Sequence, residues 1–188
     1  MKPPDPLFCG TFATEFGTMA VLWTEGRGTA LVERIMLPGE GPGPSGDIRA
    51  LCRNVCPSHS RRIAELTRRI AAFLSGRDIG FDLSILRLDL CPPFQRRVLL
   101  AEYGIPRGSV STYGRIARRT GHPGAARAVG TALAKNPFPI AIPCHRALHA
   151  DLSLGGYQGG LAMKRRLLEM EGIRFDRAGR VVIDTIYY

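Results

Sequence analysis

The chain carries the stretch IPCHRAL at residues 142–148, in which a proline precedes an adjacent cysteine and histidine. A thiol is a strong nucleophile only as the thiolate, and an imidazole beside it shifts the proton balance toward that form. Most lone cysteines are small buried hydrophobic residues. Here, however, NPFP precedes the pair at residues 136–139, and GGYQGG follows it at 155–160. The whole run therefore indicates that Cys144 is chemically reactive and that His145 assists it.

The composition is that of a globular chain. Its 188 residues are 45% apolar, which is enough for one sizeable core or two small ones. A membrane span is not expected, because no run of about 18 apolar residues occurs. The first residues, MKPPDP, lack the apolar stretch of a signal peptide. We therefore expect a cytoplasmic protein.

The five cysteines are an odd number without a regular framework, which favours reduced thiols over a disulfide scaffold. The spacing of Cys52, Cys56 and His59 suits metal ligands, yet no fourth ligand is evident. In a helix Cys52 and Cys56 would share one face, where a role in the core fits equally well. Both interpretations stay open, and the predicted functional site includes no metal.

The formal net charge of +10 is unevenly distributed. Residues 1–93 contain 11 lysine or arginine residues against 10 aspartate or glutamate residues, whereas residues 94–188 contain 15 against 6. The basic excess therefore lies in the half that holds Cys144, which suggests a polyanionic partner such as nucleic acid. The alternative is a solvated basic surface on an arginine-rich protein.

The N-terminal half is expected to form a sheet followed by a helix. Residues 8–38 are β-prone, and turn residues at 25–28 join segments 16–23 and 29–37 into a predicted hairpin. Apolar residues at helical spacing predict a helix over 60–75. The other predictions are a loop at 38–46, a short helix at 47–56, a strand at 79–88, and a boundary at Cys91-Pro92-Pro93 between domains of residues 1–91 and 92–188.

The C-terminal half is expected to be mostly helical, so the predicted fold class is α/β of the α+β type. Helices are predicted at 94–103, from Ser111 or Thr112 to 120, at 125–135 and at 161–170, with a glycine-containing turn at 121–124. Two short helices joined by such a turn match a helix-turn-helix, although an ordinary αα-hairpin is the alternative. Basic residues favour nucleic acid as the partner; they are Arg115, Arg118, Arg119 and Arg127.

Several of these motifs occur together in one known family. They are Tyr113, ARAVG at 126–130, NP at 136–137, PCHR at 143–146, the glycine-rich loop around Tyr157, and Glu171-Gly172. In their order and spacing the chain closely resembles the O6-alkylguanine-DNA alkyltransferases, also called methylated-DNA–protein-cysteine methyltransferases. The resemblance covers about residues 92–173 strongly and the N-terminal strands in outline.

The resemblance implies an N-terminal domain with an antiparallel sheet of the ribonuclease-H-like type and a helical C-terminal domain that holds the site. It implies irreversible transfer of an alkyl group from O6 of guanine to one cysteine, without a cofactor, so that each molecule acts once. The expected partner is double-stranded DNA that contains O6-alkylguanine. The protein would bind it in the minor groove as a monomer, with no membrane involved.

The resemblance also assigns catalytic roles. Cys144 is the nucleophile and acceptor, His145 relays its proton through a water, and Glu171 orients the histidine. Asn136 ties the preceding turn to the site, and Tyr113 hydrogen-bonds the flipped guanine and helps it gain a proton. The residues alone support Glu171, because a carboxylate at a helix C-terminus needs a cationic or proton-donating partner such as His145. The alternative is a solvent-exposed glutamate.

A base inside the duplex must be flipped out before its O6 group can be reached. Arg127 matches the family's arginine that enters the base stack in place of the flipped nucleotide, and the degenerate minor groove suits a protein that searches all sequences. Further DNA contacts are expected at Gln95, His122, Ala126 and Gly130, and pocket walls at Pro139, Ala147, Tyr157 and Gln158. Gln95, His122 and Gln158 differ from the residues most common in the family at these positions.

Three other functions are considered from the sequence. One is a non-catalytic protein that binds alkyl lesions and flags them for repair, although such proteins replace the cysteine that Cys144 supplies here. The second is a Cys-His-Glu hydrolase that acts on a small ester or amide. The third is a DNA-binding regulator that uses the helix-turn-helix.

Overall fold

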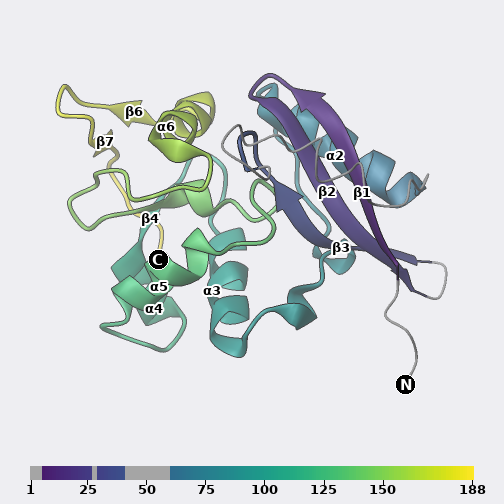
Figure 1. Ribbon diagram of the computed structural model, residues 1–188. Coiled ribbons are helices and arrows are strands. Elements are labelled where there is room, and N and C mark those ends of the chain that lie inside the picture. Colours follow the sequence, from purple (N-terminus) through teal and green to yellow (C-terminus); the bar gives the residue numbers. More distant parts are fainter. Residues whose placement is uncertain (1–5, 27–28, 41–59) are drawn as a thin grey trace. The chain divides into compact units, whose positions relative to one another are not determined.

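The structure is a computed structural model that describes residues 6–26, 29–40 and 60–188 (Figure 1). It divides into two compact units, of which unit 1 comprises the chain up to Leu90 together with residues 137–141, and unit 2 comprises residues 91–136 and 142–188. The short helix predicted at 47–56 and the possible metal ligands Cys52, Cys56 and His59 lie outside the described residues. In the part that is described, no helix is long and apolar enough to cross a membrane.

Unit 1 contains an antiparallel sheet of three strands in the order β1-β2-β3. The strands are β1 (Leu7–Thr14), β2 (Gly17–Gly26) and β3 (Thr29–Met36). The predicted hairpin is therefore confirmed as β2 and β3, which pair from Ala20↔Met36 to Gly26↔Thr29 with a register shift between Leu22 and Trp23. The β-prone residues of this segment satisfy their backbone hydrogen bonds in the sheet. The central strand β2 buries Met19, Ala20 and Val21 in succession, so side chains on both of its faces are covered.

Helix α2 (Arg61–Leu74) covers the sheet by packing against β1 and β3 (Figure 1). Its apolar residues recur at helical spacing and form one buried face, while its arginines face outward. The helix ends at Ser75, and Gly76 follows with a φ of 91°, a conformation that glycine adopts without steric cost. The helix predicted at 60–75 is thus confirmed. Its buried residues are Ile63, Leu66, Ile70, Phe73 and Leu74.

The strand predicted at 79–88 is wrong. The chain there forms two short 3-10 helices, η1 (Leu83–Ile85) and η2 (Leu88–Leu90), and among the described residues its one β-bridge is the parallel bridge between Val32 and Leu86. The reason is local. The Asp82 carboxylate accepts hydrogen bonds from the backbone N–H and the hydroxyl of Ser84 at 2.8 and 2.6 Å, which turns the backbone away from an extended course.

The expectation of reduced cysteines also needs correction. Cys91 and Cys144 are not in a disulfide bond, but Cys9 is disulfide-bonded. An odd number of cysteines argues against a complete framework, yet it leaves room for a single bond.

Unit 2 is mainly helical, with two short pairs of strands and with turns between the helices. The helices are α3 (Pro93–Tyr103), α4 (Tyr113–Arg119), α5 (Ala126–Ala134), η3 (Cys144–Arg146) and α6 (Gly160–Met170). Strand β4 (Ser111–Thr112) runs parallel to β5 (Ala147–Leu148), and β6 (Arg174–Phe175) runs antiparallel to β7 (Val181–Val182). The four predicted helices of this half are confirmed, and the α+β class with them.

The helix-turn-helix forms because its ends are marked in the sequence. The Thr112 side chain caps α4 by accepting a hydrogen bond from the N–H of Arg115 at 3.3 Å. Gly121 and Gly124 in the following turn have φ values of 80° and 88°, so the chain reverses there without strain. Helices α4 and α5 then pack against each other and against α3.

A hydrophobic cluster of unit 2 includes residues that follow shortly after Cys144 and Glu171 in the chain. It contains Val110 before β4, Leu148 in β5, Leu168 in α6, Ile173 after Glu171, and Val181 in β7. Each of these side chains is at most 6% exposed, so their burial holds β5 against the end of α6. The cluster thereby fixes residues on both sides of the site.

Helix α3 offers a test of this packing. Leu99 is fully buried, and Leu99→Ala should lower the free energy of unfolding by about 2–5 kcal/mol because it leaves a cavity. Leu100 is the matched control, since it lies on the same helix but is 42% exposed. Leu100→Ala should change stability by less than about 1 kcal/mol in the same urea titration. Equal losses in the two variants would contradict the assignment of the buried face.

Candidate active site

Cys144 begins the 3-10 turn η3 and is 5% exposed. The buried Asn136 amide donates hydrogen bonds to the Ile142 carbonyl at 3.0 Å and to the Cys144 Sγ at 3.2 Å. Burial raises the pKa of the Cys144 thiol to about 12, whereas the Asn136 hydrogen bond acts in the opposite direction. The resting sulfur is therefore a thiol that needs a base, and Asn136 is placed to stabilise the thiolate.

His145 and Glu171 are in direct contact and both are buried. The His145 Nε2 lies 2.9 Å from the Glu171 Oε1. Burial lowers the pKa of His145, which keeps the imidazole neutral. Burial alone would raise the pKa of Glu171, but the hydrogen bonds from His145 and Arg146 and the positive charge of Arg146 outweigh it and lower the pKa to about 2. An ionised carboxylate only accepts, so Nε2 carries the proton and Nδ1 holds the lone pair that a base requires.

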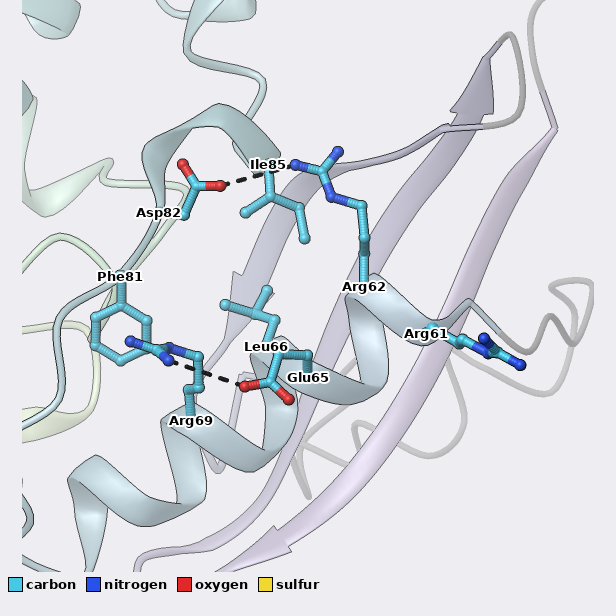
Figure 2. A pocket seen from close by; sticks show the side chains of 8 residues that line it. All are labelled: Arg61, Arg62, Glu65, Leu66, Arg69, Phe81, Asp82 and Ile85. Carbon is cyan, nitrogen blue, oxygen red and sulfur yellow. Dashed lines mark ion pairs between the residues drawn. The ribbon is translucent and has the colours of Figure 1, made fainter.

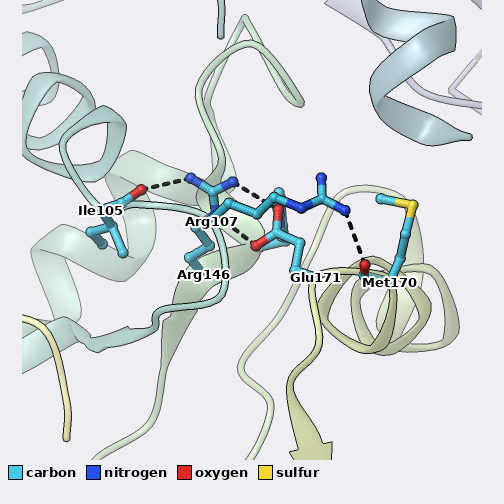
Figure 3. Close-up of polar contacts among 6 residues, drawn as sticks. Ile105, Arg107, Arg146, Met170 and Glu171 are labelled. Atoms are coloured by element: carbon cyan, nitrogen blue, oxygen red, sulfur yellow. Dashed lines mark hydrogen bonds and ion pairs between the residues drawn. The ribbon is translucent and has the colours of Figure 1, made fainter. Parts of the chain in front are cut away.

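Arg146 completes this group, although the sequence analysis gave it no role beyond the motif. Its Nε and Nη2 bind the two oxygens of Glu171 at 2.9 and 2.7 Å, and its Nη1 donates to the Ile105 carbonyl at 2.6 Å (Figure 3). Nearby, Arg107 donates to the carbonyl of Met170 at 3.0 Å (Figure 3). The sequence did contain a signal for such a residue, because a glutamate at the C-terminus of a helix needs a cationic partner. Arg146 supplies that charge, while His145 stays neutral.

Lys164 is a buried residue of the site that the sequence analysis missed. It is 0% exposed, and its Nζ donates to the Ala147 carbonyl at 2.7 Å and to the Gly155 carbonyl at 3.0 Å. The ammonium therefore ties β5 to the glycine-rich loop, and it lies 5.9 Å from the centre of the Tyr113 ring. The sequence could have indicated this burial, because helical spacing places Lys164 on the same apolar face of α6 as Leu167 and Leu168.

Tyr113 lies at the start of α4 and is closely approached by the glycine-rich loop. A Cβ atom at Gly155 would lie 2.1 Å from the Tyr113 Oη, so only glycine fits there. Burial raises the pKa of the Tyr113 phenol to about 12, which keeps it protonated and able to donate.

A cavity of about 520 Å³ opens beside Tyr113, a volume within the range of small-molecule pockets. The structure thereby brings four sequence-predicted residues together: Tyr113, Ala126, Arg127 and Gly130. His149 also lines it and was missed; its exposed ring packs edge-on against Tyr113 with 5.4 Å between the centroids. Thr131, Ala134 and Gly156 complete the lining.

The amides of Gln95 and Gln158 bind protein carbonyls at the C-terminal end of α5. The Gln95 Nε2 donates to the carbonyls of Ala132 and Lys135 at 3.1 and 2.8 Å. The Gln158 Nε2 donates to those of Ala134 and Asn136 at 2.9 and 3.0 Å. Both side chains therefore hold the end of this helix.

Four further residues that the sequence analysis assigned to the site do not line the cavity beside Tyr113. The His122 Nδ1 is 2.8 Å from the Thr120 carbonyl in the turn before α5, and the Tyr157 ring faces His145 edge-on at 6.4 Å. Ala147 is fully buried and contributes the carbonyl bound by Lys164. Pro139 is buried in the segment 137–141, which belongs to unit 1.

The basic residues of the helix-turn-helix are not equivalent. Arg115 is bound through its Nη1 to the carbonyls of Ile186 and Tyr188, so it fastens the C-terminal segment. Arg118, Arg119 and Arg127 are exposed. These three are available to a polyanion.

A second cavity, of about 450 Å³, lies in unit 1 and contains none of the predicted site residues (Figure 2). It is rich in arginine, but Arg62 and Arg69 form ion pairs with Asp82 and Glu65, each at 3.9 Å (Figure 2). The charges of these two arginines are therefore compensated by carboxylates of unit 1 itself.

Comparison with known proteins identifies the family. Residues 93–173 match the family described as 6-O-methylguanine DNA methyltransferase, DNA binding domain. The chain is 40% identical over 139 residues to a methylated-DNA–protein-cysteine methyltransferase from Methanopyrus kandleri, covering 73% of this chain and 93% of that protein. The chain belongs to the methylated-DNA–protein-cysteine methyltransferase family.

Two further relatives bear on this family assignment. The protein of the same name from Methanothermobacter thermautotrophicus is 48% identical over 114 residues, and the match spans 61% of this chain and 64% of that protein. The solved structure of Mycobacterium tuberculosis OGT in complex with DNA has a TM-score of 0.63 at 33% identity, covering 88% of this chain and 93% of that one. The family likeness thus extends through both units of the fold.

Glu171 can be tested by its effect on stability. Glu171→Gln should lower the free energy of unfolding at pH 7 by about 3–5 kcal/mol, because Arg146 would be left buried without a carboxylate. In the wild type, the pKa of about 2 lies below the usual 4.5, so this stabilisation is present above pH 4.5 and is lost as the pH falls toward 2. The variant should lack this acid dependence in urea titrations between pH 2 and 7.

The control for this experiment is Glu169→Gln. Glu169 lies on α6 and is exposed, where it pairs with Arg165. Its removal should change stability by less than about 1 kcal/mol. A comparable loss in both variants would show that the Glu171 contacts add nothing specific.

Proposed function

We propose that this protein repairs DNA by transferring an alkyl group from O6 of guanine to the Sγ of Cys144, and that each molecule reacts once. The observation that carries the proposal is the set of buried contacts around the thiol. Asn136 donates to the sulfur, and the neighbouring His145 is held by Glu171 as a neutral base. The names of the family members support the chemistry, since they describe a methyltransferase that acts on methylated DNA and a protein cysteine.

In the proposed reaction, Cys144 attacks the alkyl carbon in line with the bond to O6. An S–C bond forms, the C–O6 bond breaks, and the bonding pair stays with the purine. The thiol proton leaves toward the lone pair of His145 Nδ1, and the purine takes up one proton with Tyr113 as donor. Protons and electrons therefore balance without a cofactor. The thioether product has no leaving group, which is why the protein is consumed.

We also infer that the flipped base enters the cavity beside Tyr113 and that α5 faces the minor groove of a DNA duplex. The exposed Arg127 and the small residues Ala126 and Gly130 line one side of this cavity. Small residues allow a helix to approach a backbone closely, while the arginine reaches into the stack. The protein would act as a monomer, because one set of these residues completes the site.

Cys144→Ser should abolish alkyl transfer while it leaves DNA binding within about twofold, because serine is a weak nucleophile of similar size. Mass spectrometry after incubation with DNA that contains O6-methylguanine checks the result. The wild type should gain one methyl group per molecule on the Cys144 peptide. Repeated turnover of a small ester, or DNA binding without methyl transfer, would contradict the proposal and favour a hydrolase or a lesion-binding protein, respectively.

Arg127→Ala should slow transfer from duplex DNA by about tenfold or more, because the unstacked base loses the side chain that replaces it. Reaction with free O6-benzylguanine should stay within about twofold, since no base has to be flipped. Arg118→Ala, on the exposed face of α4, serves as the control for loss of one positive charge. An equal loss on both substrates for Arg127→Ala would contradict the role in base flipping.

A further inference from the structure

A further cavity of unit 2, of about 400 Å³, lies at the C-terminal ends of α3 and α4. Its lining residues are Arg97, Leu100, Ala101, Gly104, Arg119, Thr120 and Tyr188, and the cavity beside Tyr113 shares none of them. Two of these residues are arginines and none is acidic. The lining therefore carries a positive charge, whereas Glu65 and Asp82 line the cavity of unit 1 together with its arginines.

The charges of Arg97 and Arg119 are not compensated within the protein. Both side chains are exposed, and among the residues that the structure describes neither forms an ion pair within 4 Å. The carbonyl oxygen of Tyr188 is bound by Arg115 instead. A guanidinium group stays protonated at any physiological pH, so the cavity offers two permanent positive charges to a ligand.

Neither arginine is required to cap the helices that end here. Basic side chains at a helix C-terminus often bind its last carbonyl groups, but other groups satisfy them at this place. The Tyr188 hydroxyl donates to the Ala101 carbonyl of α3 at 2.7 Å. The Thr120 hydroxyl donates to the carbonyls of Ile116 and Ala117 in α4, each at 3.0 Å.

The ring of Tyr188 fixes one wall of the cavity. The Arg119 Cζ lies 5.4 Å from the centre of this ring, which is a cation–π contact. A Cβ atom at Gly104 would lie 2.8 Å from the Tyr188 Oη, so the glycine leaves room for the ring. A side chain that is already held in place loses less freedom when a ligand binds.

The cavity adjoins the turn that leads into α5. Thr120 begins this turn and lines the cavity. Arg97 lies three residues after Phe94 and thus on the same side of α3, and the Phe94 ring packs edge-on against His122 in the turn with 5.1 Å between the centroids. A DNA strand that passes the turn on its way along α5 can therefore reach Arg97 and Arg119.

We propose that this cavity binds a backbone phosphate of duplex DNA through the guanidinium groups of Arg97 and Arg119, away from the flipped nucleotide. Guanidinium groups match the geometry of phosphate oxygens and bind them in pairs of hydrogen bonds. A contact of this kind positions the duplex without reading its sequence. The inference rests on the proposed function, because it names a further contact with the same DNA.

The test is fluorescence anisotropy of an undamaged duplex, titrated from about 50 to about 300 mM salt. Arg97→Gln and Arg119→Gln should each lower the magnitude of the slope of log affinity against log salt by about 1, and the double variant by about 2, because fewer counterions are released. Arg97→Lys and Arg119→Lys keep the charge and should keep the slope. Arg165→Gln removes an exposed arginine that is paired with Glu169 on α6, and it should leave the slope unchanged.

A double variant with the wild-type slope, an equal decrease in Arg165→Gln, or a wild type that binds no duplex would overturn the proposal. Thermal unfolding identifies a variant that fails to fold, and Arg97→Gln alone carries the test if Arg119→Gln does so. Binding of undamaged DNA involves no alkyl transfer, whereas the proposed function is judged by the methyl group on Cys144. A failure of one is therefore distinguishable from a failure of the other.

Discussion

The buried carboxylate of Glu171 is the contact on which the site depends. It lies at the C-terminal end of α6, where the helix dipole disfavours a negative charge, and it is held there by His145 and Arg146. The same arginine reaches the carbonyl of Ile105 after α3. One carboxylate thus joins the active-site turn to two helices, and it sets which nitrogen of the imidazole carries the proton.

The apolar packing around this contact explains why the thiol needs assistance. Ile142, Ala147 and Leu148 flank the nucleophile and are fully buried, so water that would stabilise a thiolate is excluded. The same exclusion strengthens each remaining interaction, because charges and hydrogen bonds act more strongly at low dielectric constant. A site of this kind suppresses reaction with unrelated electrophiles until a substrate supplies the missing contacts.

The helices with regular apolar spacing and the short motif around Cys144 could be predicted from the sequence. Helices α2 to α6 have apolar residues at helical spacing, with capping or turn residues at their ends, and Cys144, His145 and Glu171 belong to motifs that are short in sequence. The strand predicted at 79–88 was wrong because the hydrogen bonds between Asp82 and Ser84 turn the backbone despite the strand-like composition of this segment. Lys164 was missed for another reason. Its burial results from contacts with segments that are distant in the chain, and the exposed Arg165 and Arg166 that follow it make this part of α6 look like a solvated face.

The two glutamines at the end of α5 have a consequence for how the protein responds to salt. Gln95 and Gln158 satisfy the last carbonyls of this helix with neutral amides rather than with lysine or arginine. Hydrogen bonds between neutral groups are little affected by ionic strength, whereas contacts of arginine with phosphate weaken steeply. High salt should therefore release the protein from a polyanion without loosening α5, which we propose faces the DNA, so that this surface is ready for the next encounter.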